Sequence, residues 1–485
     1  MLRFLVLVAL VAIAHGNPGG GGYYGGYPQY NNNGGQGYYG PPGGAGGAGG
    51  MPGGAMGGGG GGGGGFGGQP GAPGGMNGGG GGGGVSLICI VFTSCTPPTT
   101  KEEIEYWNKV ARRRLDKKFA LHKPDEREKP PKNVIFFLGD GMGIATVTLA
   151  RNARGQREKR ADINELFAFE DFDYSGHVKT SSMYHHVTDS AAGATALFCG
   201  RKTKNGYLGT KPGKERQKKR CEDPDTRIED GIADLAVKKA IFCNSHFTLS
   251  GMSVGFVSTS PITDATPGAL YAKDIKRTER SGTEKKQCKD AAAQLLEFPA
   301  NKFKVMMGGS RRHLLPRGAG DGRRKDGRDI HKEWQKLNGK RYVLSSIDDF
   351  ENHTVGEDEH VLGVFYDREL SYVPHLQVVE KLADPVMPRL ANMTAMALEI
   401  LMKQRTSEGF FLMVEGAFID KFTHSSEMHL ALDEVTEMDL AIQHAVAHAP
   451  PDTLIVVTAD HAHALTIPGY QPKQNSVFGM DLIEE

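Results

Sequence analysis

Short apolar runs that alternate with helical patterns constrain the fold of this chain more than any other feature. The apolar runs lie at residues 134–138, 254–257, 305–307, 361–365, 410–414 and 454–457. The helical patterns lie at residues 191–198, 228–240, 390–403 and 430–448. Buried strands that alternate with helices predict an α/β fold with a doubly wound, mostly parallel sheet flanked by helices. The chain from about residue 100 onward is long enough to bury one large core of this kind.

The first hundred residues are expected to form two segments that lack a hydrophobic core. Residues 1–16 begin with Arg3, continue with an apolar stretch and end in small residues, which is typical of a secretory signal peptide. The stretch is too short to span a bilayer. Residues 17–84 are mostly glycine, so we expect residues 17–100 to be disordered, as a linker, a matrix-binding tail or a gene-model error. Residues 101–485 remain as the folded domain of a secreted or cell-surface protein.

Charge and cysteine usage exclude other classes of protein. The net charge is +1, and the basic clusters at residues 112–114, 211–220 and 311–325 carry no interleaved aromatic residues, so nucleic acid is not an expected partner. None of the six cysteines forms a CxxC pair, which disfavours a cysteine zinc site. The secretory context permits disulfides, and Asn352 and Asn392 begin glycosylation triplets.

Acidic residues and histidines follow three of the apolar runs. Asp140 follows the first run, Glu415 follows the run at 410–414, and Asp460 and His461 follow the last run. Functional residues of open α/β sheets gather beyond the carboxyl ends of strands. These residues therefore predict a metal site at that edge of the sheet.

The ligand types indicate which metals would bind there. Asp420 and His424 are four residues apart, so on a helix both would face one cation. Carboxylate and imidazole groups suit zinc, whereas Asp140, Glu415 and a threonine form an oxygen set that suits magnesium.

Ser190 is the candidate nucleophile. It precedes a run of small residues that predicts a helix, whose N-terminus favours an anion such as phosphate, although an ordinary serine N-cap is the alternative. A second candidate, Ser253, lies in the GxSxG pattern of residues 251–255. That pattern needs a strand before the serine and a helix after it, and here the order is reversed, so we reject it.

Several of these motifs together resemble the alkaline phosphatase family. The resemblance covers about residues 131–470, in the family's order and spacing, and is carried by residues 133–143, 188–191, 264–267, 414–420 and 458–463. It implies a three-layer sandwich and phosphate monoester hydrolysis through a phosphoserine, with a preference for alkaline pH. It also implies two zinc ions, one magnesium ion and a homodimer.

The resemblance implies a role for each motif residue. Ser190 would attack phosphorus and Arg277 would clamp the phosphate. The zinc ion that activates the serine would be held by Asp140, Asp460 and His461. Two ligands of the other zinc ion would be Asp420 and His424. Magnesium would be held by Asp140, Thr266 and Glu415.

Other positions have supporting roles in the same resemblance. Asp189 would hold Arg277 in place, and His463 would orient a zinc-bound carboxylate. Asp264 and Lys421 would tune magnesium occupancy and phosphate affinity, or are plain surface residues. A disulfide would join Cys221 and Cys288. A calcium site is not implied, because Tyr366 stands where a carboxylate is expected.

The sequence also departs from the family. The family has a further zinc-binding histidine downstream, but no histidine occurs between residues 464 and 485. We therefore expect either a fragment that lacks the C-terminal strands of the sheet or a protein that binds zinc poorly at this site. A lipid anchor would need the missing C-terminus. Residues 241–250 look like an insertion, either a surface loop or unspliced sequence. Rival functions are a sulfatase or phosphodiesterase, and a catalytically impaired, Gly-rich extracellular matrix protein.

Overall fold

The computed structural model describes the residues that form the predicted sheet. The described ranges are 131–158, 166–172, 174–213, 224–238, 251–282, 289–366, 388–405, 408–467, 469–470 and 475–477, with residues 105, 108, 109 and 112. Among them, seven strands form one sheet in the order β6-β7-β5-β3-β8-β1-β9, and every neighbouring pair is parallel. A separate antiparallel pair is formed by β2 (Tyr207–Leu208) and β4 (Ile275–Lys276).

The strands of the large sheet agree with the apolar runs. They are β1 (Asn133–Gly139), β3 (Ser253–Pro261), β5 (Val305–Gly309), β6 (Lys340–Leu344), β7 (Glu359–Val364), β8 (Phe410–Gly416) and β9 (Thr453–Ala459). The prediction missed β6, because its Lys-Arg-Tyr-Val-Leu sequence is charged and partly exposed, as suits the strand at one end of the sheet order.

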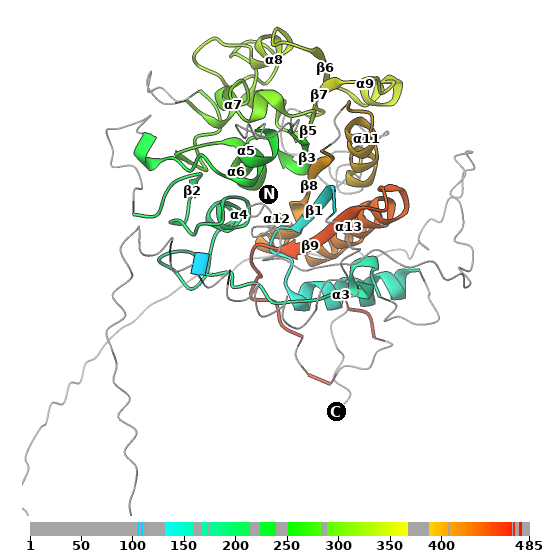
Figure 1. The fold of residues 1–485 in the computed structure, drawn as a ribbon. Coiled ribbons are helices and arrows are strands. Elements are labelled where there is room, and N and C mark those ends of the chain that lie inside the picture. The colour runs from blue at the N-terminus through cyan, green and yellow to red at the C-terminus, as the bar shows by residue number, and fades with distance from the viewer. Residues whose placement is uncertain are drawn as a thin grey trace, which may run out of the picture. The chain divides into compact units, whose positions relative to one another are not determined.

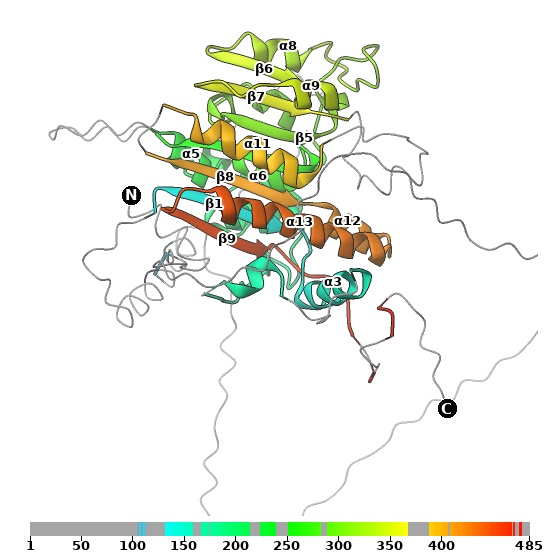
Figure 2. The ribbon, with the colours of Figure 1, turned by 90° about the vertical axis from the view of Figure 1, so that its right-hand side faces the viewer.

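Helices cover both faces of the sheet, as Figures 1 and 2 show. One face packs against α4 (Ser190–Cys199), α5 (Ile232–Val237), α6 (Ala265–Tyr271), α7 (Ala291–Gln294) and α8 (Ile330–Gln335). The opposite core includes α3 (Ile144–Arg157), α9 (Ile347–Asn352), α11 (Leu390–Met402), α12 (Phe418–His424) and α13 (Met428–His448). The predicted helix at 228–240 is shorter than expected and begins at Ile232.

Alternation along β1 explains why both faces are buried. Phe136 and Leu138 point into the core under α4, whereas Ile135 and Phe137 point into the core under α11 and α13. All four side chains are fully or almost fully buried, and successive side chains of a strand point to opposite faces. A strand that is apolar on both sides therefore requires helices on both sides, which confirms the predicted three-layer α/β sandwich.

The remaining sequence predictions concern single residues or short segments. Ser253 is the first residue of β3 and is buried, so the GxSxG serine precedes a strand, as the rejection of that pattern requires. Asn352 and Asn392 are exposed, and their glycosylation remains a prediction. The signal peptide, the Gly-rich segment, residues 241–250 and the cysteines Cys221 and Cys288 lie outside the described residues. None of the helices that the structure describes has the length and apolar character to cross a membrane.

Helix α13 carries a buried carboxyl group that makes stability depend on pH. Glu434 is 2% exposed, and its Oε2 atom has no hydrogen-bond partner among the described residues. Burial raises the pKa of Glu434 from 4.5 to about 8, and the nearby Glu437 adds to the shift. The folded protein therefore keeps a proton on Glu434 that the unfolded chain releases at lower pH.

We expect Glu434→Gln to stabilise the protein increasingly between pH 5 and pH 8. The folded-state pKa is raised, so the wild type loses stability as the pH rises above 4.5 and stops losing it near pH 8, by at most about 1.4 kcal/mol per pH unit. The neutral glutamine removes this loss. Urea unfolding at several pH values checks the result, with the exposed Glu399→Gln as the control. A difference between wild type and Glu434→Gln that does not change with pH would contradict it.

Candidate active site

The predicted site residues meet at the carboxyl edge of four adjacent strands. Asp140 follows β1, Asp460 follows β9, Glu415 lies near the end of β8, and Asp264 lies just beyond β3. These strands are neighbours in the order β3-β8-β1-β9. Because they are parallel, their carboxyl ends lie on one side, and side chains from distant parts of the sequence converge there.

Ser190 lies against this cluster at the start of α4. Its Oγ atom donates a hydrogen bond to Oδ1 of Asp140 at 3.2 Å, and the serine is 3% exposed. The N-cap of α4 is Asp189, whose carboxylate accepts from Ala192 N at 3.0 Å. The alternative of an ordinary serine N-cap is therefore wrong, because Asp189 caps the helix and leaves the Ser190 hydroxyl available to the site.

Asp460 and His461 complete the group around Asp140. The Asp460 Oδ1 atom accepts from Gly141 N at 3.2 Å and from His461 N at 2.9 Å. The His461 Nε2 atom lies 3.3 Å from Asp140 Oδ1 and 3.7 Å from Asp460 Oδ2. The three ligands that the resemblance assigns to one zinc ion are thus in mutual reach.

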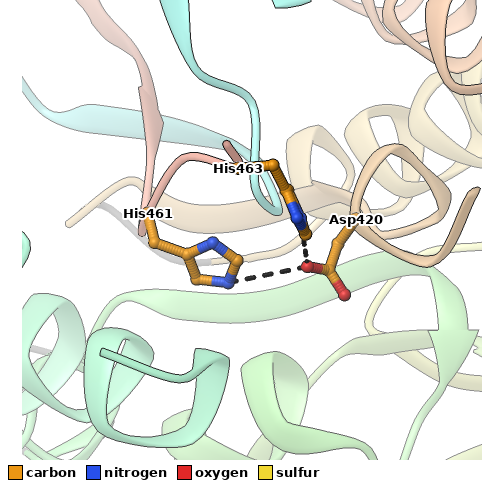
Figure 3. Close-up of side chains that lie close together, drawn as sticks. All are labelled: Asp420, His461 and His463. Carbon is orange, nitrogen blue, oxygen red and sulfur yellow. Dashed lines mark hydrogen bonds and ion pairs between the residues drawn. The ribbon is translucent and has the colours of Figure 1, made fainter. Parts of the chain in front are cut away.

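A second group surrounds Asp420 on α12 (Figure 3). The Asp420 Oδ1 atom lies 2.7 Å from His463 Nε2 and 3.6 Å from His461 Nε2. The His424 Nε2 atom lies 3.4 Å from Asp420 Oδ1. The His424 side chain is 70% exposed, so it lies at the rim of the site. Burial acts to raise the pKa of Asp420, but the hydrogen bond to His463 and the three nearby imidazoles bring the net pKa below its usual range.

Glu415 forms an oxygen-rich part of the site. Its Oε2 atom accepts hydrogen bonds from Ser258 Oγ and, at 3.2 Å, from Ser260 Oγ. Burial raises the pKa of Glu415 to about 7, although Ser258 and Thr266 act to lower it. Thr266 therefore lies near Glu415, and their role as magnesium ligands remains a prediction.

Arg277 is held by Asp189, as the resemblance implies. The Arg277 Nη1 atom donates to Asp189 Oδ2 at 3.1 Å, and Gly206 N donates to the same oxygen at 2.9 Å. The Arg277 backbone N–H donates to Gly206 O at 2.9 Å. One third of the Arg277 side chain is exposed, so its guanidinium group is fixed in position yet accessible to an anion.

Asp264 is not a plain surface residue. It is 5% exposed, caps α6, and lies 3.5 Å from Lys421 Nζ. Burial acts to raise the pKa of Asp264, but the cations Lys421, Arg280 and Arg277 bring it below its usual range. The surface alternative is wrong for Asp264, and Lys421 is its half-buried partner.

Two glycines allow these groups to approach so closely. A Cβ atom on Gly141, whose φ is +66°, would lie 2.5 Å from His463 Nε2. A Cβ atom on Gly193 of α4 would lie 3.1 Å from Asp460 Cβ. Side chains at either position would push apart the loops and the helix that form the site.

The donor set fits divalent cations. Among the described residues, Asp140, Asp460 and His461 form one group with ligand atoms within 4.8 Å of one another, and Asp420, His461 and His463 form another. The buried Asp460 Oδ2 atom accepts no hydrogen bond from any described residue. Burial, together with Asp460, Asp420 and Glu415, raises the pKa of Asp140 well above its usual range. Such a concentration of buried carboxylates requires positive charge to balance it.

The comparison with protein families decides what kind of site this is. The family model described as "Alkaline phosphatase" matches residues 131–485. The chain belongs to the alkaline phosphatase family. This confirms the resemblance and supports a phosphoric monoester hydrolase of a metal-dependent family.

Individual alkaline phosphatases show how far the likeness extends. The chain is 33% identical over 413 residues to "Membrane-bound alkaline phosphatase" of Bombyx mori, covering 80% of this chain and 70% of that protein. It is 33% identical over 409 residues to the human tissue-nonspecific isozyme, covering 80% of this chain and 73% of that protein. The crystal structure of Thermus thermophilus alkaline phosphatase matches with a TM-score of 0.54 and 27% identity, over 69% of this chain and 60% of that chain.

Two sets of contacts in the site were not predicted from the sequence. Ser258 and Ser260, which contact Glu415, alternate along β3, and this two-residue spacing on one face was a usable signal. Arg280, which contacts Asp264, had no sequence signal other than its distance of three residues from Arg277.

Proposed function

We propose that this chain hydrolyses phosphate monoesters through a covalent phosphoserine on Ser190. The observation that carries the proposal is the 3.2 Å contact between Ser190 Oγ and Asp140 Oδ1, inside a group of ligand-type side chains. An ordinary serine at a helix start needs no such surroundings.

The residues present would provide ligands for two zinc ions and one magnesium ion. Asp140, Asp460 and His461 would hold one zinc ion, Asp420 and His424 the other, and magnesium would be held by Asp140, Thr266 and Glu415. Bound there, the cations would supply Lewis-acid stabilisation of phosphate oxygens and lower the pKa of nearby hydroxyl and water oxygens.

The chain's own residues carry out the two displacements. Ser190 Oγ forms a bond to phosphorus as the ester P–O bond breaks, and the proton that the serine loses ends on the leaving oxygen, so that an alcohol is released. Arg277 offers a planar pair of N–H donors to two phosphate oxygens, held in place by Asp189. The N-terminus of α4, which begins at Ser190, would favour the same anion through the helix dipole. Water then attacks phosphorus, which restores the Ser190 hydroxyl and releases inorganic phosphate.

Several surrounding features belong to the same proposal. Residues 1–16 would direct secretion, residues 17–100 would remain disordered, and residues 101–485 would form the phosphatase domain. Asn352 and Asn392 would be glycosylated, Cys221 and Cys288 would pair, and the enzyme would act as a homodimer outside the cell.

Turnover of a monoester against a diester tests the proposed function. We expect the full chain, supplied with zinc and magnesium, to hydrolyse 4-nitrophenyl phosphate at least about tenfold faster than bis(4-nitrophenyl) phosphate. Removing divalent metal with a chelator should abolish turnover, and returning zinc and magnesium should restore it. Preference for the diester would favour a phosphodiesterase. No turnover of either ester would favour the impaired matrix protein.

A further inference from the structure

A second arginine lies behind the phosphate-binding arginine. Arg280 Nη2 donates to Asp264 Oδ1 at 2.6 Å, and Arg280 Nε donates to the backbone oxygen of Arg277 at 3.4 Å. The side chains of Arg280 and Asp264 are 26% and 7% exposed. Arg280 thus contacts both the buried carboxylate and the backbone that carries Arg277.

The contacts of Asp264 leave no room for a short bond to Arg277. Its Oδ1 atom accepts from Ala265 N at 2.8 Å and from Arg280 at 2.6 Å, which uses both lone pairs of that oxygen. Arg277 Nη2 lies 3.9 Å from the same oxygen, beyond hydrogen-bond distance. The Oδ2 atom faces Lys421 at 3.5 Å. Arg277 therefore has a hydrogen bond to Asp189 and only a longer ion pair, at 3.9 Å, with Asp264.

Removing Arg280 would change this balance. Asp264 is a buried carboxylate whose Oδ1 atom lies 2.6 Å from Arg280 Nη2 and whose Oδ2 atom lies 3.5 Å from Lys421 Nζ. Its Oδ1 atom would then have a free acceptor position near Arg277 Nη2. A guanidinium group drawn into a paired contact with Asp264 has fewer donors left for phosphate.

We propose that Arg280 is a positioning residue that prevents Asp264 from forming a hydrogen bond with Arg277, and that it thereby sets the affinity of the site for phosphate. The inference rests on the proposed function, since it takes Arg277 as the phosphate-binding group.

The test compares phosphate affinity in single and double variants of the full chain. Inorganic phosphate is titrated calorimetrically, and KM and kcat are measured with 4-nitrophenyl phosphate. We expect Arg280→Met to weaken phosphate binding and raise KM about tenfold, with a smaller effect on kcat. In the Asp264→Asn background, which removes the competing charge, Arg280→Met should change phosphate affinity by less than about threefold. Arg328→Met, which removes an arginine paired with Glu333, is the control and should match the wild type.

Two results would overturn the inference. One is unchanged phosphate affinity in Arg280→Met, and the other is an equal loss in the Asp264→Asn background, which would mean that Arg280 acts through its own charge. If Arg280→Met does not fold, Arg280→Lys replaces it: a lysine that still bonds Asp264 should stay within about threefold of the wild type, and a tenfold loss would also overturn the inference. Absence of turnover in the wild type would instead contradict the proposed function, while the calorimetric titration still tests Arg280.

Discussion

Ser190→Ala is expected to lower kcat at least about 10³-fold with 4-nitrophenyl phosphate as substrate. The reason is that alanine removes the atom that attacks phosphorus, while Asp140 and the rest of the cluster stay in place. Fold and metal content should hardly change, because Ser190 is a small residue whose hydroxyl makes a single hydrogen bond to the described residues, at 3.2 Å to Asp140. Steady-state kinetics and a melting curve check both parts of the expectation.

The matched control is Ser253→Ala. Ser253 is also buried, and it lies in the GxSxG pattern, but its position at the start of β3 is away from the carboxyl edge of the sheet. We expect this variant to keep the wild-type kcat. Wild-type turnover in Ser190→Ala, or a matching loss in Ser253→Ala, would remove Ser190 from the proposed role.

Asp460→Asn is expected to have opposite effects on stability and on activity. A carboxylate oxygen of Asp460 lies within 4.8 Å of a ligand atom of Asp140 and of His461. The Asp460 Oδ2 atom is buried and accepts no hydrogen bond from the described residues. Burial raises the pKa of Asp460, so its ionised form costs stability near pH 7. The neutral amide should raise the metal-free melting temperature, by about 1 °C for each kcal/mol gained in a domain of this size.

The same change should remove the response to metal. A divalent cation binds the folded protein and stabilises it by mass action, and the amide is a much weaker ligand than the carboxylate. Zinc should therefore raise the melting temperature of the wild type more than that of Asp460→Asn. The loss in activity should exceed the about 10–100-fold typical of groups that only support a ligand.

Asp230→Asn is the control for Asp460→Asn. Asp230 is 42% exposed and paired with Arg201, so its loss should leave the zinc response unchanged. A metal-free Asp460→Asn protein that melts below the wild type, with an unchanged zinc response, would show that Asp460 serves the fold and not a cation.

The fold could be predicted from sequence where burial is complete. Strands such as β1 and β8 are apolar on both faces, and that pattern has no other stable arrangement than a sheet covered by helices on both sides. Strand β6 was not predicted because it begins with two adjacent charged residues, Lys340 and Arg341, and is partly exposed. The length of α5 was overestimated because its apolar pattern continues past Val237, where the described helix ends.

The site could be predicted in part for a related reason. Asp140 and Asp460 follow buried strands, so parallel pairing alone brings them to one edge. The contact of Arg280 with Asp264 depends on the geometry of the loops next to β4 and α6, which no periodic pattern specifies. Such contacts join residues that are close in space through tertiary structure, so spacing along the chain carries no signal for them.

The most direct test of the account is the site of covalent phosphorylation during turnover. The full chain with zinc and magnesium is mixed with 4-nitrophenyl phosphate at acidic pH, where hydrolysis of a phosphoserine is slowed, then quenched with acid and digested for peptide mass spectrometry. We expect phosphate on Ser190 in the wild type and none on the corresponding peptide of Ser190→Ala. An actively turning-over wild type whose phosphate is found on another residue would contradict it.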